Sequence, residues 1–210
     1  MKFNAADLSS MAQRYRATFV NSLSGYKSAN LVGTVDAQGR HNLCIVNSVF
    51  HLGAHPPLLG MILRPHTVRR DTLENILLKE CYTLNHVNQA IVAQAHQTSA
   101  RYDAEESEFE KTGLTPQPCD VIPAPYVLES KLKLAMKLVE IKPIEINDTQ
   151  LVIGQIEQVI VEDNAISEDG FVDLQQLDEV AIVGLDGYYT ATQIHRYEYA
   201  KPDKPPLIKK

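Results

Sequence analysis

The segment ANLVGTVDAQGRHNLCIVNSVF, residues 29–50, contains two apolar, β-branched runs separated by a turn. The first run spans residues 29–35 and the second spans residues 43–50, with Asp36-Ala37-Gln38-Gly39 between them. Two such runs joined by a short polar turn that contains glycine predict a β-hairpin. The fold prediction starts from this hairpin.

Further strand-like runs follow along the chain. Residues 58–63 form a short apolar run, and residues 151–161 form a long one. Residues 131–140 alternate, which predicts a strand with two different faces. One face carries Leu132, Leu134, Met136 and Leu138, and the other carries Lys131, Lys133 and Lys137. Two later runs, residues 180–183 and 193–199, are expected to close the sheet.

Helical patterns are fewer than strand patterns. We expect helices over residues 71–79, 87–98 and 104–111, the last of them ended by Gly113. Many strands with helices at intervals, and no regular βαβ alternation, indicate a mainly β fold with inserted helices, a β-barrel in particular. We expect one domain over residues 1–210, with a helical lead-in over 1–20 and an extended tail over 201–210.

Composition excludes several classes of protein. The 210 residues include 20 Lys and Arg against 26 Asp and Glu, a formal charge of −6, which argues against a nucleic-acid or anionic-membrane footprint. No apolar run approaches the ~18 residues of a membrane span, and no signal peptide is indicated. The three cysteines form no CxxC pair, so we expect free thiols in the cytoplasm and no metal site.

Sequence motifs of protein catalysis are missing. The chain has no GxSxG, P-loop, HExxH or helix-opening GxGxxG motif. The acidic run Glu105-Glu106-Ser107-Glu108 is interpreted as the solvated face of a helix. No residue is therefore assigned as a catalytic acid or base.

The stretch RPHTVRRDT, residues 64–72, concentrates positive charge just before a predicted helix. Arginine side chains, hydroxyl groups and a helix N-terminus together suit a phosphate. The competing interpretation is a surface loop whose Asp71 or Thr72 only caps the helix. These residues alone do not separate the two.

Two other polar groups interrupt apolar segments. Asn47 and Ser48 stand inside the second run of the hairpin, where buried polar side chains need partners. They mark either a strand end or bulge, or a site that binds the edge of a planar heterocycle. After the second predicted helix, His96 to Tyr102 either cap its end or complete a polar pocket.

Taken in order, these segments resemble the flavin reductase-like family with the FMN-binding split β-barrel fold, which includes flavoredoxin-type proteins. The matching stretches run from Gly39-Arg40-His41-Asn42 through Asn47-Ser48-Val49-Phe50 to Gly184-Leu185-Asp186-Gly187-Tyr188-Tyr189. The resemblance implies a homodimer that binds FMN without a covalent link. The FMN-binding residues that it implies are Cys44, Ile45, Val46, Asn47, Ser48, Val49 and Phe50 along the ring and ribityl chain, Arg64, Thr67, Arg69, Arg70 and Thr72 near the phosphate, and His96 and Ser99 at the pocket.

The resemblance also implies an activity, an NAD(P)H-dependent flavin reductase in which hydride passes from nicotinamide to flavin N5. Such chemistry belongs to the cofactor, so it needs no catalytic triad from the protein. One alternative is an FMN-binding electron-transfer protein that a partner enzyme reduces. A third is a split barrel that binds another ligand, such as haem or pyridoxal phosphate, although the match at Asn47 and Ser48 favours flavin.

Overall fold

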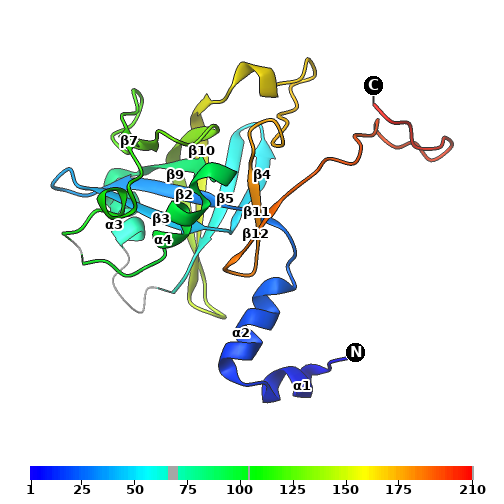
Figure 1. The fold of residues 1–210 in the computed structure, drawn as a ribbon, viewed down its shortest axis with the longest axis horizontal. Coiled ribbons are helices and arrows are strands. Elements are labelled where there is room, and N and C mark those ends of the chain that lie inside the picture. The colour runs from blue at the N-terminus through cyan, green and yellow to red at the C-terminus, as the bar shows by residue number, and fades with distance from the viewer. Residues whose placement is uncertain (66–70, 104, 210) are drawn as a thin grey trace.

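The computed structural model describes residues 1–65, 71–103 and 105–209. Its main element within these ranges is an antiparallel sheet of seven strands (Figure 1). In spatial order the strands are β3 (His41–Val46), β2 (Asn30–Val35), β6 (Cys81–His86), β9 (Lys133–Ile144), β10 (Thr149–Ile160), β5 (Pro57–Leu63) and β4 (Val49–Ala54). The predicted mainly β class is confirmed.

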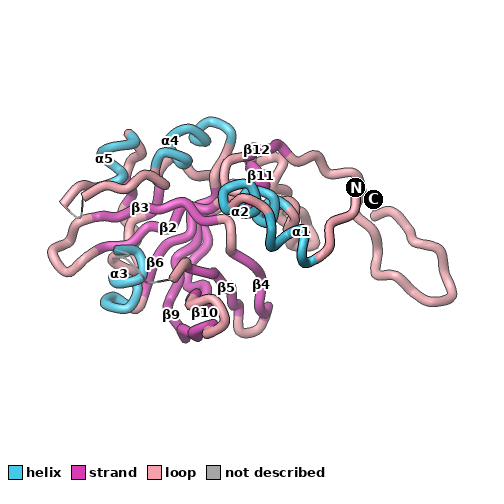
Figure 2. The backbone as a smooth tube through the Cα atoms, turned by 90° about the horizontal axis from the view of Figure 1, so that it is seen from below, coloured by secondary structure: helices cyan, strands magenta, loops and turns pink. Residues whose placement is uncertain are grey.

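The two edge strands of this sheet, β3 and β4, are consecutive in the chain. The chain leaves β3 at Val46 and enters β4 at Val49. Within the described part of the chain, β3 pairs with β2 alone and β4 with β5 alone. Val46 and Val49 nevertheless pack against the same apolar cluster, so the sheet curls until its edges face each other (Figure 2). The result is a barrel that stays open between β3 and β4.

Two apolar clusters hold this architecture. The first fills the barrel with side chains such as Val32, Tyr82 and Met136, and α3 (Asp71–Lys79) adds Leu73 and Ile76 to it. The second lies outside β2 and β3. It is covered by η1 (Gln89–Ile91), α4 (Val92–Gln97), α5 (Glu108–Thr112) and β11 (Val180–Val183).

The remaining elements lie around the barrel. β1 (Lys27–Ser28), β11 and β12 (Gly187–Thr190) form a small three-stranded sheet, and β7 (Pro116–Gln117) pairs with β8 (Tyr126–Val127). Two helices, α1 (Ala5–Ser10) and α2 (Gln13–Ser22), precede β1, and η2 (Asp163–Ala165) follows β10.

The hairpin predicted from the first segment is present. Val35 pairs with His41, and the Asp36 carboxylate accepts hydrogen bonds from the backbone N–H groups of Gln38 and Arg40 at 2.8 and 2.9 Å. Gly39 adopts a φ of 83°, which favours glycine. The second run, residues 43–50, is not one strand, because it breaks at residues 47–48 into β3 and β4.

Other boundaries differ from the predictions for local reasons. The helix expected over 87–98 starts late, because the Val87 N–H bonds to the Ala29 carbonyl and Asn88 caps η1. The helix expected over 104–111 is α5, with Gly113 at its left-handed C-cap as predicted. The strand expected over 193–199 is wrong. Within that segment Tyr197 bridges only to Ile208, outside both sheets, so the small sheet ends at β12.

The alternating sequence pattern of β9 does not reveal that one of its lysines is buried. Lys133 lies on the face opposite Leu134, yet only 6% of it is exposed. Its ammonium group donates to the Gln117 side-chain oxygen at 2.5 Å and to the Leu128 carbonyl at 3.0 Å. Burial lowers the pKa of Lys133. The β7–β8 segment therefore covers a face that the sequence pattern left polar.

Candidate functional site

The open line between β3 and β4, which we call the seam (residues 46–49), contains the two polar residues singled out in the sequence. Asn47 donates through its amide to the Gly184 carbonyl at 2.6 Å, and the Ser48 hydroxyl donates to the Ile62 carbonyl at 2.7 Å. These side chains therefore attach the seam to the β11–β12 turn and to β5. They leave main-chain groups, rather than side-chain donors, to meet a ligand.

The neighbouring residues of β3 and β4 also use their side chains for packing. Cys44, Val46 and Val49 pack against the barrel cluster, whereas Ile45 packs against the outer cluster. Phe50 is the exception, with 41% of its surface exposed. Along this edge, a bound molecule would meet the backbone of the strand and the Phe50 ring.

The outward edge of β3 has a defined register. The Leu43 N–H points away from β2 and bonds to the carboxylate of Glu108 at 2.9 Å. Because backbone groups of alternate residues point to the same side of an antiparallel strand, the N–H and C=O of Ile45 also point outward. One donor and one acceptor at this position are the groups that the edge of a planar heterocycle requires.

The cationic stretch is described only at its two ends. Arg64 follows β5 and is exposed. Thr67, Arg69 and Arg70 lie outside the described residues, so their predicted role at a phosphate stays a prediction. Thr72 lies inside α3, with its hydroxyl 3.0 Å from Asn42 Oδ1 and 3.1 Å from Cys44 Sγ. Its hydroxyl thus faces β3.

Thr72 belongs to a chain of hydrogen bonds that joins three elements. The Asn75 amide donates to the Thr34 hydroxyl at 3.1 Å, and that hydroxyl donates to Asn42 Oδ1 at 3.2 Å. Asn42 in turn donates to both carboxylate oxygens of Glu108, at 2.9 and 3.1 Å. This network ties α3, the β2–β3 hairpin and α5 together beside the strand that leads to the seam.

Glu108 is the charged member of that network. Burial raises the pKa of its carboxyl group, and the hydrogen bond from the Leu43 N–H opposes the rise. The nearby charge of Asp71 raises it further, while the Asn42 amide lowers it. The interpretation of residues 105–108 as a wholly solvated face is wrong for Glu108, since this carboxylate covers the outer edge of β3.

His96 lies in α4, and Ser99 follows that helix. Both are exposed, and His96 Nδ1 lies 3.0 Å from the Tyr188 hydroxyl. Burial of Tyr188 and the charge of Asp186 raise the pKa of that phenol. Asn47 bonds to Gly184 at the turn of the same β11–β12 hairpin, so this hairpin contacts both the seam and α4.

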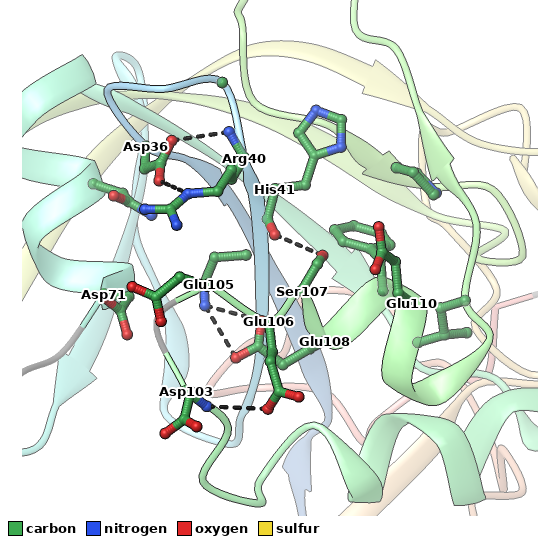
Figure 3. A pocket seen from close by; sticks show the side chains of 16 residues that line it. Asp36, Arg40, His41, Asp71, Asp103, Glu105, Glu106, Ser107, Glu108 and Glu110 are labelled. Carbon is green, nitrogen blue, oxygen red and sulfur yellow. Dashed lines mark hydrogen bonds and ion pairs between the residues drawn. The ribbon is translucent and has the colours of Figure 1, made fainter.

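A cavity of about 330 Å³ lies beside this network, between the β2–β3 turn, the start of α3 and α5 (Figure 3). The residues that line it include seven acids: Asp36, Asp71, Asp103, Glu105, Glu106, Glu108 and Glu110. Asp36 is neutralised by Arg40 at 2.6 Å, and Glu106 by Lys111 at 2.5 Å. Among the described residues, a lining so rich in carboxylates disfavours a phosphate in this cavity.

Several residues of this region were not assigned to the site from the sequence. Asn42 and Glu108 are separated by 66 positions, and Asn47 and Gly184 by 137. No local pattern connects partners so far apart. The only available signal was that Asn42 and Gly184 lie in stretches that resemble the flavin reductase-like family.

A curled sheet that is open between two consecutive edge strands, with outward main-chain groups at the opening and Arg64 near it, defines a split-barrel binding protein. Comparison with known proteins identifies the family within this class. The chain belongs to the flavin reductase-like family, since the model of the flavin reductase like domain matches residues 23–176. The predicted family and the predicted split-barrel fold are both confirmed.

Individual relatives agree with this family. A crystal structure of a candidate flavin reductase with a split barrel domain from Shewanella frigidimarina NCIMB 400 is 57% identical, covers 95% of this chain and all of its own, and superposes with a TM-score of 0.92. Flavoredoxin of Desulfovibrio vulgaris (Miyazaki F) is 27% identical over 85% of this chain and 92% of its own, with a TM-score of 0.70. An uncharacterized protein of Aquifex aeolicus is 25% identical over 76% of this chain and 82% of its own.

The described residues contain no helix that is both long and apolar enough to span a membrane. They also contain no group of three or more His, Cys, Asp or Glu side chains placed to hold a metal ion.

Proposed function

We propose that this protein is an FMN-dependent oxidoreductase, a flavin reductase that passes hydride from NAD(P)H to flavin. The observation that carries the proposal is the seam. Ile45 directs a backbone donor and a backbone acceptor out of the open edge of β3, immediately before the polar pair Asn47 and Ser48. Membership of the flavin reductase-like family supports a flavin as the ligand, rather than haem or pyridoxal phosphate.

The seam suits the ring system of a flavin for a chemical reason. The pyrimidine side of the isoalloxazine ring carries alternating acceptors and a donor, which pair with main-chain groups of an extended strand. The exposed Phe50 ring adds an apolar surface beside this edge. Cys44, Val46 and Val49 then act indirectly, because their packing in the barrel holds the strand in place.

We assign the phosphate of FMN to Arg64, Thr67, Arg69 and Arg70. Arg64 is exposed where β5 ends, so its guanidinium group is free to form charge-assisted bonds with a phosphate. Thr72 is better assigned to positioning, since its hydroxyl faces Asn42 and Cys44. We keep His96 and Ser99 as residues of the FMN pocket.

When bound, the flavin supplies the hydride chemistry. The work of the chain is to orient the ring through the β3 edge, to hold the seam through Asn47 and Ser48, and to keep water from the reacting face. No titratable side chain needs to move a proton at the seam. This agrees with side chains there that serve packing and hydrogen bonds to the backbone.

A second candidate function is electron transfer, in which a partner enzyme reduces the bound FMN. The 27% identity to a flavoredoxin supports it. Both a nicotinamide and a protein partner would approach the same open edge. We also propose that the protein is a homodimer and that it works in the cytoplasm, where its three cysteines, which form no disulfide, would stay reduced.

Two measurements test these proposals. Titration with FMN, FAD and riboflavin, followed by flavin fluorescence, should show preference for FMN, and absence of binding to any of the three would refute the flavin site. Anaerobic mixing of the FMN complex with NADH or NADPH should then bleach the flavin absorbance. Colour that persists with both nucleotides would instead favour the electron-transfer protein.

A further inference from the structure

Two terminal segments project from the body of the protein (Figure 1). The first is the N-terminal helix pair, α1 and α2, in which no residue is buried. The second is the C-terminal arm, residues 191–209, in which every residue except Arg196 is exposed. Together they leave a large part of the chain outside both apolar clusters.

The projecting segments are rich in apolar side chains. In the arm, Tyr199 is 94% exposed and Ile194 is 85% exposed, and Tyr197, Leu207 and Ile208 are exposed as well. In the helix pair, the Phe3 and Phe19 rings lie edge to face at 5.3 Å, and Tyr15 stacks on Phe19. Exposed apolar side chains gathered on projecting segments indicate an interaction site in a folded protein.

Both segments leave the molecule from one place. α2 leads into β1, and the arm follows β12, so the two start at the two edge strands of the small sheet. Where the two segments begin, the rings of Tyr26 and Tyr189 lie edge to face with their centroids 5.2 Å apart, and both side chains are exposed. Exposed aromatic side chains therefore lie where both segments begin.

The arm has a definite shape although it packs on little. The Arg196 guanidinium forms an ion pair with Asp169 at 2.6 Å and lies over the Phe171 ring at 3.9 Å. Lys209 also bonds to Asp169, and the Glu198 N–H donates to the Leu207 carbonyl. An isolated hairpin and a ten-residue helix are each marginal in water, so both segments need a surface to pack against.

The exposed surface area of the chain indicates how large an interface these two segments could form. The chain exposes 13064 Å², whereas a compact monomer of 23.4 kDa is expected to expose about 9,700 Å². A permanent dimer buries about 2,000–5,000 Å² in total over its two subunits, so the surplus of about 3,300 Å² on one subunit is more than enough for such an interface. A small ligand or a short peptide would cover only a fraction of it.

We propose that the N-terminal helix pair and the C-terminal arm clasp a second copy of this chain. A copy related by two-fold symmetry brings the same two apolar segments, so each copy covers the surplus surface of the other. This inference rests on the proposed homodimer and adds which segments hold it together. It also places the clasp next to the β11–β12 hairpin that Asn47 holds at the seam.

The test is the dimer dissociation constant of the full-length chain, measured by sedimentation velocity over a concentration series. We expect a dimer of twice 23.4 kDa. The double variant Ile194→Asp with Tyr199→Asp should weaken it about 100-fold, the effect of losing two buried apolar contacts. The matched control is Val121→Asp, a half-exposed residue in the β7–β8 loop away from the arm, which should leave the constant unchanged.

The outcomes separate the two proposals. A monomeric full-length chain at high micromolar concentration would overturn the homodimer and the clasp together. A dimer whose constant is the same in the arm variant and the control would overturn the clasp alone. Because the two arm positions are almost fully exposed in one copy, the variant should keep the wild-type circular dichroism spectrum. FMN titration of each variant tests the flavin site independently of the dimer.

Discussion

Removal of the Glu108 carboxylate tests the hydrogen-bond network beside the seam. The variant Glu108→Ala leaves the Leu43 N–H and the Asn42 amide without their acceptor. Each buried donor that loses its partner costs about 1–3 kcal/mol, and some water will enter from the adjoining cavity. We therefore expect the free energy of unfolding to fall by about 2–4 kcal/mol.

Glu108→Gln separates the hydrogen bonds from the charge. The glutamine oxygen still accepts from one donor, but its NH₂ group faces the other donor, so the expected loss is about 1–2 kcal/mol. The control is Glu110→Ala on the same helix, which is exposed and should change stability by less than about 0.5 kcal/mol.

The pH dependence follows from the pKa of Glu108, which burial raises above its value in the unfolded chain. Between the unfolded and folded pKa values the folded state binds more protons. The contribution of Glu108 to the free energy of unfolding therefore rises as pH falls through the folded pKa, and it is fully present below the unfolded value of about 4.5. Glu108→Gln, which does not titrate, should lack this component of the pH dependence.

Urea denaturation at several pH values provides the measurement, with an unchanged slope as evidence that the unfolded state is the same. If Glu108→Ala is as stable as Glu110→Ala, the network does not stabilise the fold. If the wild type and Glu108→Gln have parallel pH profiles, the raised pKa is wrong.

Three further predictions concern other parts of the molecule. Arg64→Ala should weaken binding of FMN, measured by fluorescence titration, but leave riboflavin binding unchanged; equal losses would remove Arg64 from the phosphate site. Gly33→Ala should cost about 1–3 kcal/mol in urea denaturation, because the added Cβ would collide with the Pro125 carbonyl oxygen and the Thr83 hydroxyl; wild-type stability would refute the close packing of β2 there. The lowered pKa of Lys133 predicts that its contribution to stability rises with pH through the folded pKa, towards the unfolded value of 10.5, and that Lys133→Met removes this slope; a slope that persists in Lys133→Met would contradict the lowered pKa.

Local patterns predicted the elements whose causes are local. The β2–β3 hairpin was predictable, because Asp36 and Gly39 make the turn within five residues of each other. The helix over residues 71–79 was also predictable, and so was the end of α5 at Gly113. The strand over 193–199 was predicted wrongly, because a strand-like run does not say which strand it pairs with. In the structure that segment belongs to an arm without a neighbouring strand in its own chain.

Long-range contacts could not be predicted in the same way. Lys133 alternates like a solvent-facing residue, but the β7–β8 segment folds over it and supplies its acceptors. Glu108 stands in an acidic run, and only the packing of α5 against β3 turns it towards Asn42. In both cases the partner comes from a distant part of the chain, and the hydrogen bond exists only because the tertiary fold brings it close.

The sequence by itself determined the mainly β class, the family and the position of the polar pair at residues 47–48. Turn residues, the period of apolar side chains and the order of motifs can all be recognised from residues that are close together in the chain. The tertiary structure decided what that pair does. It places β3 and β4 at opposite edges of one curled sheet and gives both polar side chains backbone partners, so that the main chain of β3 is left to face a ligand. The physical reason is that an unpaired strand edge depends on which strands are neighbours, and that depends on the whole chain.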